Sequence, residues 1–575
     1  MNKLIKFIKP YTFFVIAAPL LMIIEVATEL ILPRIMSDVI DTGVAAHNTS
    51  YILTRGVIMI LIAILGVIGG VGCTICASKA SVGFGTDIRT EMLKKIGSFS
   101  FVNLDKFHTS SLVTRLTNDI TQIQQIVLMS LRMLVRAPFT FIGGLVMAFS
   151  INFSLTLNLV VAIIILAITI TFLVKFTFPL FKLVQEKVDN VNIIMRENLS
   201  GVRVIKAFVR ADKEKRKFEA KNTELRDTTI SAFRIVTLMI PIMMIVMNFV
   251  TVIIIWKGGN LVYNGKMITG DLMAYLTYVT QILISFMMVG MVFMQLTRGK
   301  ASIERINEVL DTELDIIEIA KPNTTAITKG KITFNNVTFT YPNSTGDPVL
   351  ENINLTINSG ETVGILGETG AGKSTLVNLI PRLYDVTKGN IYIDNVDIKD
   401  MSKSHLRSNI GIVLQKATLF SGTVKDNILW GKKDATNEEI LKACSDAQAL
   451  EFINEMPKKL DTYVEQAGVN LSGGQKQRIS IARTLIKKPK ILIFDDSTSA
   501  LDTGTEAKIQ QALKTNYQNS TKIIIAQKIT SVMQADKIIV INSGQITAEG
   551  NHDYLLKNCL AYQEIYNSQL KKEEN

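Results

Sequence analysis

The sequence predicts an all-α transmembrane domain of six helices with long cytoplasmic extensions, followed by an α/β domain. Two observations predict this class. The chain has 575 residues, of which 48% are hydrophobic, and its mean hydropathy of +0.29 is too high for an ordinary soluble protein. Long uncharged runs fill residues 1 to about 300, whereas 325–575 has charges throughout, as soluble α/β domains do. We therefore assign 1–310 to the transmembrane domain, 311–330 to a linker and 331–575 to the soluble domain.

Six segments are long and apolar enough to cross a bilayer, which takes about 20 residues of helix. They are 12–35, 56–78, 129–150, 155–178, 235–256 and 272–296. Only "SINFS" separates the third segment from the fourth, so these two are expected to form a tight hairpin. The connections from the second to the third and from the fourth to the fifth are long, polar and helix-prone. We expect them to extend the helices beyond the membrane.

Basic residues define the orientation of these segments. They gather at the N-terminus ("KLIKFIK") and in the two long connections ("RTEMLKKIGSF" and "VRVIKAFVRADKEKRKFEAK"), whereas the loop 37–55 has the acids Asp38 and Asp41. The positive-inside rule then places the N-terminus, both long connections and the soluble domain in the cytoplasm, with the chain in the cell membrane. This placement also accounts for the net charge of +12, and no nucleic-acid-binding module is recognisable, so no nucleic-acid partner is expected.

Two acids, Glu25 and Glu29, lie four residues apart in the first apolar segment and therefore on one helical face. One interpretation is a site for cations or a proton, because ionisable groups inside a membrane usually face a polar cavity. The other, which we prefer on the sequence alone, is that the helix extends beyond the outer leaflet and leaves both acids in water. The methionine-rich runs "MIPIMMIVM" and "SFMMVGMVFMQ" fit a cavity for varied hydrophobic compounds, and they fit ordinary helix packing equally well.

The soluble domain contains a phosphate-binding motif. In "VGILGETGAGKSTLVNLI" a strand, a glycine-rich turn and a helix follow one another, and Gly367–Ser374 fits G-x-x-x-x-G-K-[ST]. Its backbone N–H groups would surround phosphate at a helix N-terminus. Lys373 would reach the β and γ phosphates, and Ser374 would hold Mg²⁺ with Thr375 beside it. The soluble domain is therefore predicted to be an α/β P-loop nucleotide-binding domain.

Two further segments complete the phosphate chemistry. Asp495 ends the apolar strand in "ILIFDDSTSALD" and would bind Mg²⁺ directly or through water. In "LSGGQKQR", Ser472 and two glycines precede a helix and offer a second set of N–H groups to phosphate. One chain cannot easily bring both of these sets of N–H groups onto one nucleotide. The expected arrangement is two chains head to tail, each closing the other's site.

With these motifs in place, the whole chain resembles a half-transporter of the ATP-binding cassette (ABC) exporter family, multidrug type. The resemblance rests on Gly367–Ser374, on Gln415 in "IVLQKATLF", on "LSGGQ" and on "DDSTSALD". It implies an ATP hydrolase coupled to export of hydrophobic or amphipathic compounds, with ATP and Mg²⁺ as cofactors. It also implies that Tyr341 stacks on adenine, that Gln415 senses Mg²⁺, and that "SALD" crosses the dimer interface. Coupling helices are expected near 109–116 and 209–216.

The resemblance therefore assigns two sets of site residues. The nucleotide set is Tyr341, Gly367, Glu368, Thr369, Gly370, Ala371, Gly372, Lys373, Ser374, Thr375, Gln415, Ser472, Gly473, Gly474, Gln475 and Asp502. The metal set is Ser374, Gln415 and Asp495.

Three motifs depart from the family pattern. The acid after the Mg²⁺-binding aspartate, normally a glutamate that polarises the attacking water, is Asp496 and is one methylene shorter. The switch histidine expected after the strand in "KIIIAQKITSV" is Gln527, which cannot carry a cation or shuttle a proton. The usual V-G-E-x-G pattern is broken by Glu465 and Gln466 in "TYVEQAGVN".

The first two departures predict a weakened catalytic pair, Asp496 and Gln527. The chain then looks like the subunit of a heterodimeric exporter that contributes the slow site, while its intact "LSGGQ" completes the partner's competent site. A homodimer with two slow sites, and an ATP-gated channel or regulatory subunit, are the alternatives. The residues do not distinguish a drug, a lipid or a peptide as substrate.

Overall fold

In the computed structural model the backbone is described for residues 4–319, 321–342, 344 and 346–570. Side chains are described for the same residues apart from 170, 173, 174, 178, 236, 239, 240, 289–298 and 570. The chain forms two compact units. The first comprises Met1–Gly97 with Thr109–Thr312, and the second comprises Ser98–His108 with Glu313–Asn575.

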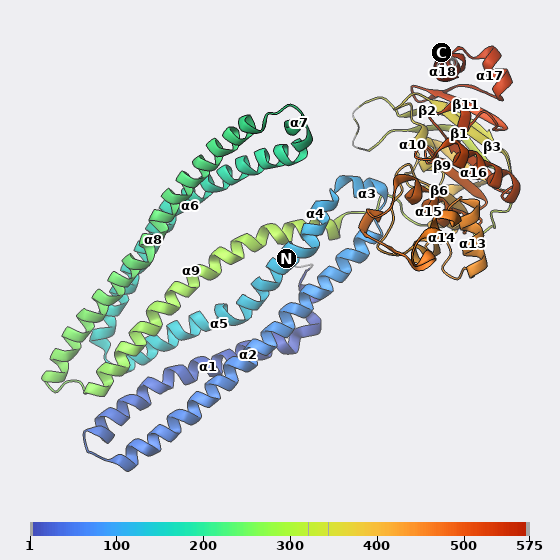
Figure 1. Cartoon of the computed structure of the whole chain (residues 1–575). Coiled ribbons are helices and arrows are strands. Elements are labelled where there is room, and N and C mark those ends of the chain that lie inside the picture. The colour runs from blue at the N-terminus through green and yellow to red at the C-terminus, as the bar shows by residue number, and fades with distance from the viewer. Residues whose placement is uncertain (1–3, 320, 343, 345, 571–575) are drawn as a thin grey trace. The chain divides into compact units, whose positions relative to one another are not determined.

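Long helices make up the first unit (Figure 1). They are α1 (Thr12–Asp38), α2 (Thr49–Gly97), α5 (Ile120–Ile151), α6 (Phe153–Ser200), α8 (Ala211–Tyr263) and α9 (Thr269–Asp311), with the short helices α4 (Thr109–Thr114) and α7 (Val202–Ala207) between them. Each of the six predicted spans lies within one long helix. In the described part of the chain, five helical segments are long and apolar enough to cross a membrane, and the apolar stretch Phe153–Thr169 of α6 is shorter.

Close backbone contact joins the first two helices. Gly69 of α2 lies against α1, where a Cβ atom on it would come within 2.9 Å of the carbonyl oxygen of Leu21. Small residues allow helices to approach in this way inside a membrane. The helices α6 and α8 pack along each other up to α7 and diverge from the remaining helices toward that end (Figure 1).

The predicted hairpin between the third and fourth spans is present. Asn152 has an extended backbone and ends α5, and its side chain accepts a hydrogen bond of 3.0 Å from the N–H of Leu155 at the start of α6. Asparagine is a preferred N-cap because its side-chain oxygen satisfies one of the free N–H groups of the first turn. One residue therefore separates two membrane helices.

A short intracellular helix belongs to the soluble unit. In α3 (Phe101–Lys106) the ring of Phe101 lies 5.9 Å from that of Tyr384. The hydroxyl of Tyr384 donates to Asp105 Oδ2 at 2.9 Å. Burial and the neighbouring carboxylate raise the pKa of Tyr384, so this hydroxyl stays protonated and remains a donor.

The expected position of the first coupling helix therefore needs a correction. The segment that packs on the soluble domain is 98–108, directly before the expected 109–116, which lies in the membrane unit. The reason is local. Ser100 and Asn103 form a capping box that starts a new helix just after α2 ends, and this places the apolar residues of α3 against the soluble domain.

The soluble unit is built on a six-stranded sheet in the order β12-β11-β3-β10-β9-β6, with a four-stranded sheet β2-β1-β4-β5 and the pair β7-β8. The strands are β1 (Ile332–Phe339), β2 (Leu350–Ile357), β3 (Thr362–Gly367), β4 (Lys388–Ile393), β5 (Val396–Asp397), β6 (Ile410–Val413), β7 (Gly422–Thr423), β8 (Tyr463–Val464), β9 (Ile491–Asp495), β10 (Thr521–Ile525), β11 (Lys537–Asn542) and β12 (Gln545–Gly550). The helices are α10 (Lys373–Leu379), α11 (Lys403–Ser408), α12 (Val424–Leu429), α13 (Asn437–Asp446), α14 (Leu450–Glu455), α15 (Gly473–Leu485), α16 (Thr503–Asn516), α17 (His552–Asn558) and α18 (Leu560–Leu570).

The central strands are parallel and apolar along their whole length. β9 lies between β10 and β6, and β3 lies between β10 and β11, all in parallel register. Every residue of β9 and of β10 is buried, because helices cover both faces of the sheet. This burial fixes the positions of the loops that follow the strands.

One carboxylate fastens the predicted linker to the soluble domain. Asp394 Oδ2 accepts the N–H groups of 328, 329 and 330 at 2.9, 2.9 and 3.1 Å, and its Oδ1 accepts that of Lys331 at 2.8 Å. Burial alone would raise the pKa of Asp394, but these four donors outweigh it and hold the pKa below its usual range.

We expect Asp394→Asn to destabilise the soluble unit by about 1–2 kcal/mol, because the amide offers one acceptor oxygen where the carboxylate offers two. The lowered pKa of Asp394 sets the direction in which the free energy of unfolding changes with pH. The stabilisation by Asp394 is complete above its unfolded pKa of about 4 and is lost as the pH falls through its lower folded pKa. Thermal unfolding of the protein and of a control, Asp434→Asn at an exposed position, measures both effects. Equal unfolding temperatures of the two variants would contradict the assignment.

Candidate functional site

Four neighbouring strands end at one edge of the six-stranded sheet. Since β3, β10, β9 and β6 are parallel and adjacent, the residues that follow them lie side by side. These residues are the P-loop (Gly367–Ser374), then Gln527, then Asp495 with Asp496, and then Gln415. The sheet therefore brings together residues that are far apart in the sequence and that the motifs identified separately.

The backbone of the P-loop is shaped for an anion. Gly370 and Gly372 have φ values of 90° and 95°, in the left-handed region that favours glycine. A Cβ atom on Gly372 would lie 2.9 Å from the carbonyl oxygen of Val349, so a side chain there would collide with the neighbouring backbone. The helix α10 begins directly afterwards at Lys373, with its first N–H groups free of helical partners. Such a terminus attracts phosphate.

Two P-loop side chains lie beside the carboxylates. Lys373 Nζ donates to the carbonyl oxygens of Gly367 and Glu368 at 2.8 and 2.7 Å, and burial lowers the pKa of this lysine. Ser374 Oγ donates to Asp495 Oδ1 at 2.7 Å. Burial, reinforced by the charge of Asp496, raises the pKa of Asp495 against the opposing effect of this hydrogen bond. The oxygens of Ser374 and Asp495 are thus adjacent, as the predicted pair of Mg²⁺ ligands requires.

Asp496 is held by both glutamines that the sequence singled out. Its Oδ2 accepts a hydrogen bond from Gln415 Nε2 at 3.0 Å and another from Gln527 Nε2 at 2.8 Å. Its N–H donates to the carbonyl oxygen of Ile525 at 3.0 Å, and its φ of 45° is left-handed. The sequence identified all three polar residues, but nothing in it indicated that one carboxylate oxygen would bind both amides.

Tyr341 lies next to the P-loop helix. Its hydroxyl is 3.1 Å from Thr375 Oγ1, and its ring packs edge-on against Phe339 and Tyr384 with centroids 4.9 and 5.3 Å apart. Thr375 is buried in the first turn of α10, and its side chain pairs with Tyr341. The adenine-stacking role of Tyr341 stays a prediction.

The signature segment, Leu471–Gln475, starts a different helix. Ser472 and Gln475 form a capping box at the N-terminus of α15, with Ser472 Oγ accepting from the N–H of Gln475 at 3.3 Å. Gly474 lies close to the carbonyl oxygen of Ala500 in "SALD". Among the described residues, no hydrogen bond or ion pair joins the signature segment to the P-loop. The P-loop and the signature segment thus precede two different helices, α10 and α15.

Asp502, the last residue of "SALD", has a structural role in the isolated chain. It is the N-cap of α16, and its side chain accepts from the N–H of Thr505 at 2.8 Å. Hydrogen bonding by Thr505 holds the pKa of Asp502 below its usual range. The carboxylate is therefore a fixed negative charge at this exposed position.

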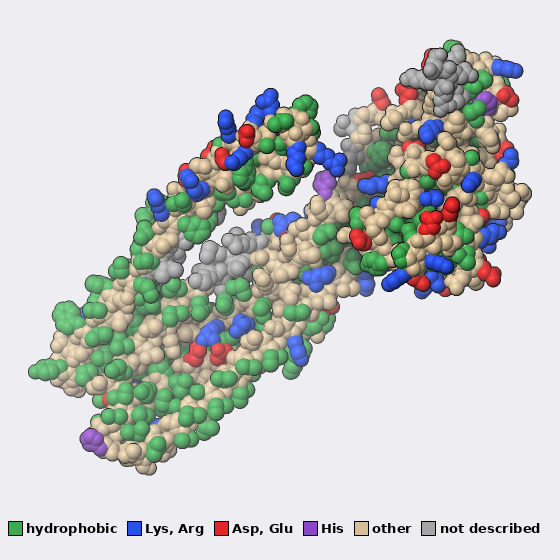
Figure 2. Space-filling view, viewed as in Figure 1, with side chains coloured by type: hydrophobic (Ala, Val, Ile, Leu, Met, Phe, Trp, Pro, Cys, Tyr) green, Lys and Arg blue, Asp and Glu red, His purple; other side chains and the backbone are tan. Residues whose placement is uncertain are grey.

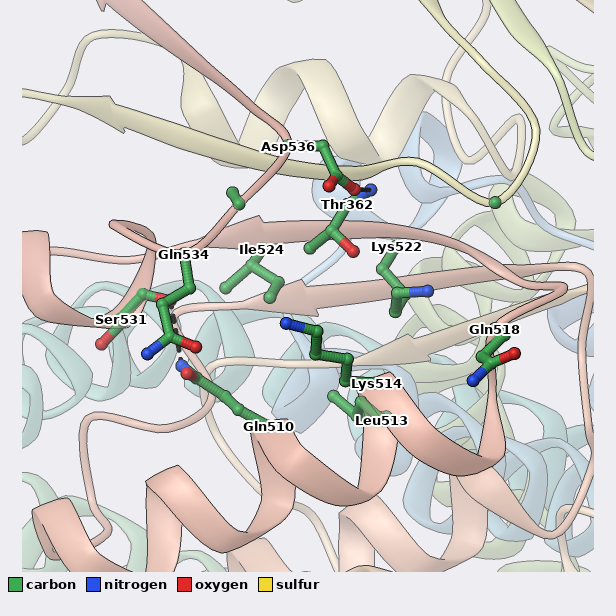
Figure 3. Close-up of a pocket in the computed structure, with 12 residues that line it drawn as sticks. Thr362, Gln510, Leu513, Lys514, Gln518, Lys522, Ile524, Ser531, Gln534 and Asp536 are labelled. Carbon is green, nitrogen blue, oxygen red and sulfur yellow. Dashed lines mark hydrogen bonds between the residues drawn. The ribbon is translucent and has the colours of Figure 1, made fainter. Parts of the chain in front are cut away.

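A hollow of about 220 Å³ lies near the amino ends of the strands β3 and β10 (Figure 3). Thr362 and Lys522, at the amino ends of β3 and β10, line it together with Lys514 of α16. Lys522 Nζ donates to the carbonyl oxygens of Tyr517 and Ser520 at 3.1 and 3.0 Å, so it is engaged in holding the preceding turn. The described residues that line this hollow include none of those predicted to bind the nucleotide.

Long apolar helices joined to an α/β domain with a P-loop, a strand-end aspartate and a separate signature segment define a half-transporter of the ABC exporter class. The chain belongs to the ABC transporter family. The family model of the ABC transporter transmembrane region matches residues 15–286, and the ABC transporter model matches residues 350–499. The protein is a multi-pass membrane protein with a cytoplasmic ATPase domain, in which ATP hydrolysis is coupled to transport.

Individual relatives agree with this assignment. The chain is 41% identical over 573 residues to an uncharacterized ABC transporter ATP-binding protein of Bacillus subtilis, YfiB, covering 100% of this chain and 99% of the relative. It is 37% identical to an ATP-dependent lipid A-core flippase of Desulfotalea psychrophila over 84% of each chain. A solved bacterial Atm1-family ABC exporter with ATP bound superimposes with a TM-score of 0.79 at 26% identity, covering 97% of this chain and 98% of the other.

Proposed function

We propose that this chain is one subunit of a heterodimeric ABC exporter, in which its own P-loop site binds ATP and hydrolyses it slowly. The proposal rests mainly on one contact: the double hydrogen bond from Gln415 and Gln527 to Asp496 Oδ2. A carboxylate oxygen has two lone pairs available for hydrogen bonds, and both amides donate to this one. One of the two oxygens of the carboxylate that should activate water is thus occupied by donors of the protein itself.

The length of the side chain adds to this effect. Aspartate is shorter than glutamate by one C–C bond, about 1.5 Å. A general base must come within about 2.6–3.2 Å of the atom whose proton it accepts. The backbone of Asp496 is tied to Ile525 on β10, so the loop has little freedom to move the carboxylate forward.

Gln527 weakens the same site in a second way. A histidine at this position could carry a positive charge or transfer a proton, whereas an amide can only hydrogen-bond. Here the amide N–H₂ group binds Asp496. The carboxylate and the residue that should assist it are therefore bound to each other.

Binding of ATP with Mg²⁺ remains compatible with this site. The oxygens of Ser374 and Asp495 are the hard ligands that Mg²⁺ takes in phosphate sites, where it keeps one or two protein ligands and binds substrate phosphates. Gln415 uses its Nε2 for Asp496, which leaves its Oε1 for the metal. When bound, Mg²⁺ would neutralise phosphate charge. Lys373, the P-loop N–H groups and Tyr341 would hold the nucleotide itself.

Surfaces of the chain support a second subunit. At the cytoplasmic tip between α6 and α8, Phe208 and Val209 are 73% and 87% exposed. Exposed apolar residues at such a turn are typical of a surface that contacts another protein. Basic side chains surround this tip (Figure 2). The signature segment keeps its full sequence and its capping box, as expected if it serves the nucleotide of another chain.

Two other functions remain as alternatives, a homodimer with two slow sites and an ATP-gated channel or regulatory subunit. The subunit composition of the complex purified from its native membrane separates the first from our proposal. Liposome measurements separate the second, because a channel gives an ion current without net ATP-dependent movement of an amphipathic dye. The name of the Desulfotalea relative, a lipid flippase, favours an amphipathic substrate.

Restoring the family residues should accelerate this site. In a complex whose other site is blocked, we expect Asp496→Glu with Gln527→His to raise the ATP turnover by at least about tenfold, because a positioned general base contributes about 10²–10⁴-fold. Steady-state phosphate release measures it. The matched control is Asp496→Asn with Gln527→His, which keeps the size of aspartate without a base and should give no gain. Equal rates of all three complexes would show that these residues do not limit hydrolysis.

The signature segment should act on the other subunit. We expect Ser472→Ala to slow phosphate release from the complex by about tenfold or more, because one hydrogen bond to a charged phosphate contributes about 1.5–3 kcal/mol. Its control is Ser568→Ala, an exposed serine that bonds only within its own helix. Unchanged turnover of the Ser472→Ala complex would contradict the head-to-tail arrangement.

A further inference from the structure

A cavity of about 400 Å³ lies among three helices of the transmembrane unit, α1, α5 and α9. Part of its lining is polar: Glu29, Arg136, Thr140 and Gln281. Most of the rest is apolar, including Leu32 and Ile284. Cavities of this size bind small organic ligands, and such a lining suits a molecule with one polar end.

An ion cluster forms the charged part of the lining. Arg136 of α5 donates through Nη1 to Glu25 Oε1 and through Nη2 to Glu29 Oε1, both at 2.5 Å. A group of acidic and basic side chains is visible on the otherwise apolar helices (Figure 2). Both acids are therefore paired with Arg136 rather than simply in water, and one of them, Glu29, lines the cavity.

The sign of the charge limits what the cavity can accept. Two carboxylates and one guanidinium leave a net charge of −1 on the cluster. Arg132, one helical turn before Arg136, does not line the cavity, and including it brings the sum only to zero. The guanidinium of Arg136 is already engaged by two carboxylates, so an anionic group would find no surplus positive charge. A cationic group would still find an acidic surface, since Arg136 binds only one oxygen of Glu29.

Two hydrogen-bonding atoms of the lining have no partner. Thr140 is 7% exposed, and its Oγ1 is buried without a hydrogen bond. Gln281 donates through Nε2 to the carbonyl oxygen of Glu29 at 3.4 Å, whereas its Oε1 is buried and unpaired. Buried polar atoms of this kind destabilise the fold unless something binds them. With the carboxylate of Glu29 they make three acceptors on residues that line one cavity.

The geometry points to an amphipathic amine as the ligand of this cavity. An alkylammonium group has three N–H donors, which match Gln281 Oε1, Thr140 Oγ1 and the carboxylate of Glu29. The hydrocarbon part would lie against Leu32 and Ile284. This inference rests on the proposed exporter function and specifies the substrate class that the transmembrane unit takes.

Three eight-carbon probes test the inference: octylamine, octanol and octanoate, which share one tail and differ in charge. The complex is held in lipid nanodiscs, and calorimetric binding is corrected with empty nanodiscs. We expect octylamine to bind at least about tenfold more tightly than octanol, and octanoate to show no saturable binding. Equal binding of the three probes, or tighter binding of octanoate, would overturn the inference.

Variants of one residue locate the binding. Gln281→Leu removes the unpaired acceptor and should weaken octylamine binding by about tenfold, whereas Gln281→Glu adds a negative charge and should strengthen it. Thr280→Val is the matched control, because the Thr280 hydroxyl bonds to the carbonyl oxygen of Leu276 in its own helix and lies outside the cavity. If Gln281→Leu binds octylamine as the unmodified complex does, the cavity holds only water and the inference fails.

The phosphate release of each complex is recorded alongside, so that two failures can be told apart. Rapid hydrolysis at this chain's own site would refute the slow-site proposal and leave the binding result as it stands. Loss of amine selectivity with slow hydrolysis intact would refute only the substrate class.

Discussion

The carboxylate of Asp496 accepts hydrogen bonds from Gln415 and Gln527, and the behaviour of the nucleotide site depends on this contact. The three residues follow three adjacent parallel strands, so the sheet itself brings them together. Buried apolar strands fix the separation of these loops, and the side chains then decide the chemistry. In the proposed function, a shorter acid and an amide in place of histidine make this a site that holds ATP and hydrolyses it slowly.

The sequence predicted the elements well because their signals are local. The six apolar segments all lie in long helices, and the P-loop lies between β3 and α10 as its glycines require. The first coupling helix was misplaced, since the start of α3 depends on the capping pair Ser100 and Asn103 rather than on hydrophobicity. The contact of both glutamines with Asp496 could not be predicted, because it depends on strand order.

The ion pairing in the transmembrane unit could not be predicted for a similar reason. Glu25 and Glu29 were recognisable as unusual, but Arg136 lies in another apolar segment and its pairing with them depends on how α1 packs against α5. Two carboxylates shared by one guanidinium keep charge inside an apolar bundle at lower cost than isolated ions. One member of the cluster, Glu29, also lines the cavity, so the helix packing that pairs the ions also underlies the proposed ligand preference.

The central claim is that this chain's P-loop site retains ATP and hydrolyses it much more slowly than the partner's site. The most direct measurement labels the assembled complex with radioactive ATP during turnover, crosslinks the nucleotide, separates the subunits and identifies the nucleotide on each. The account predicts intact ATP on this chain while the partner carries mainly ADP. ADP on this chain at the same rate as on the partner would contradict it.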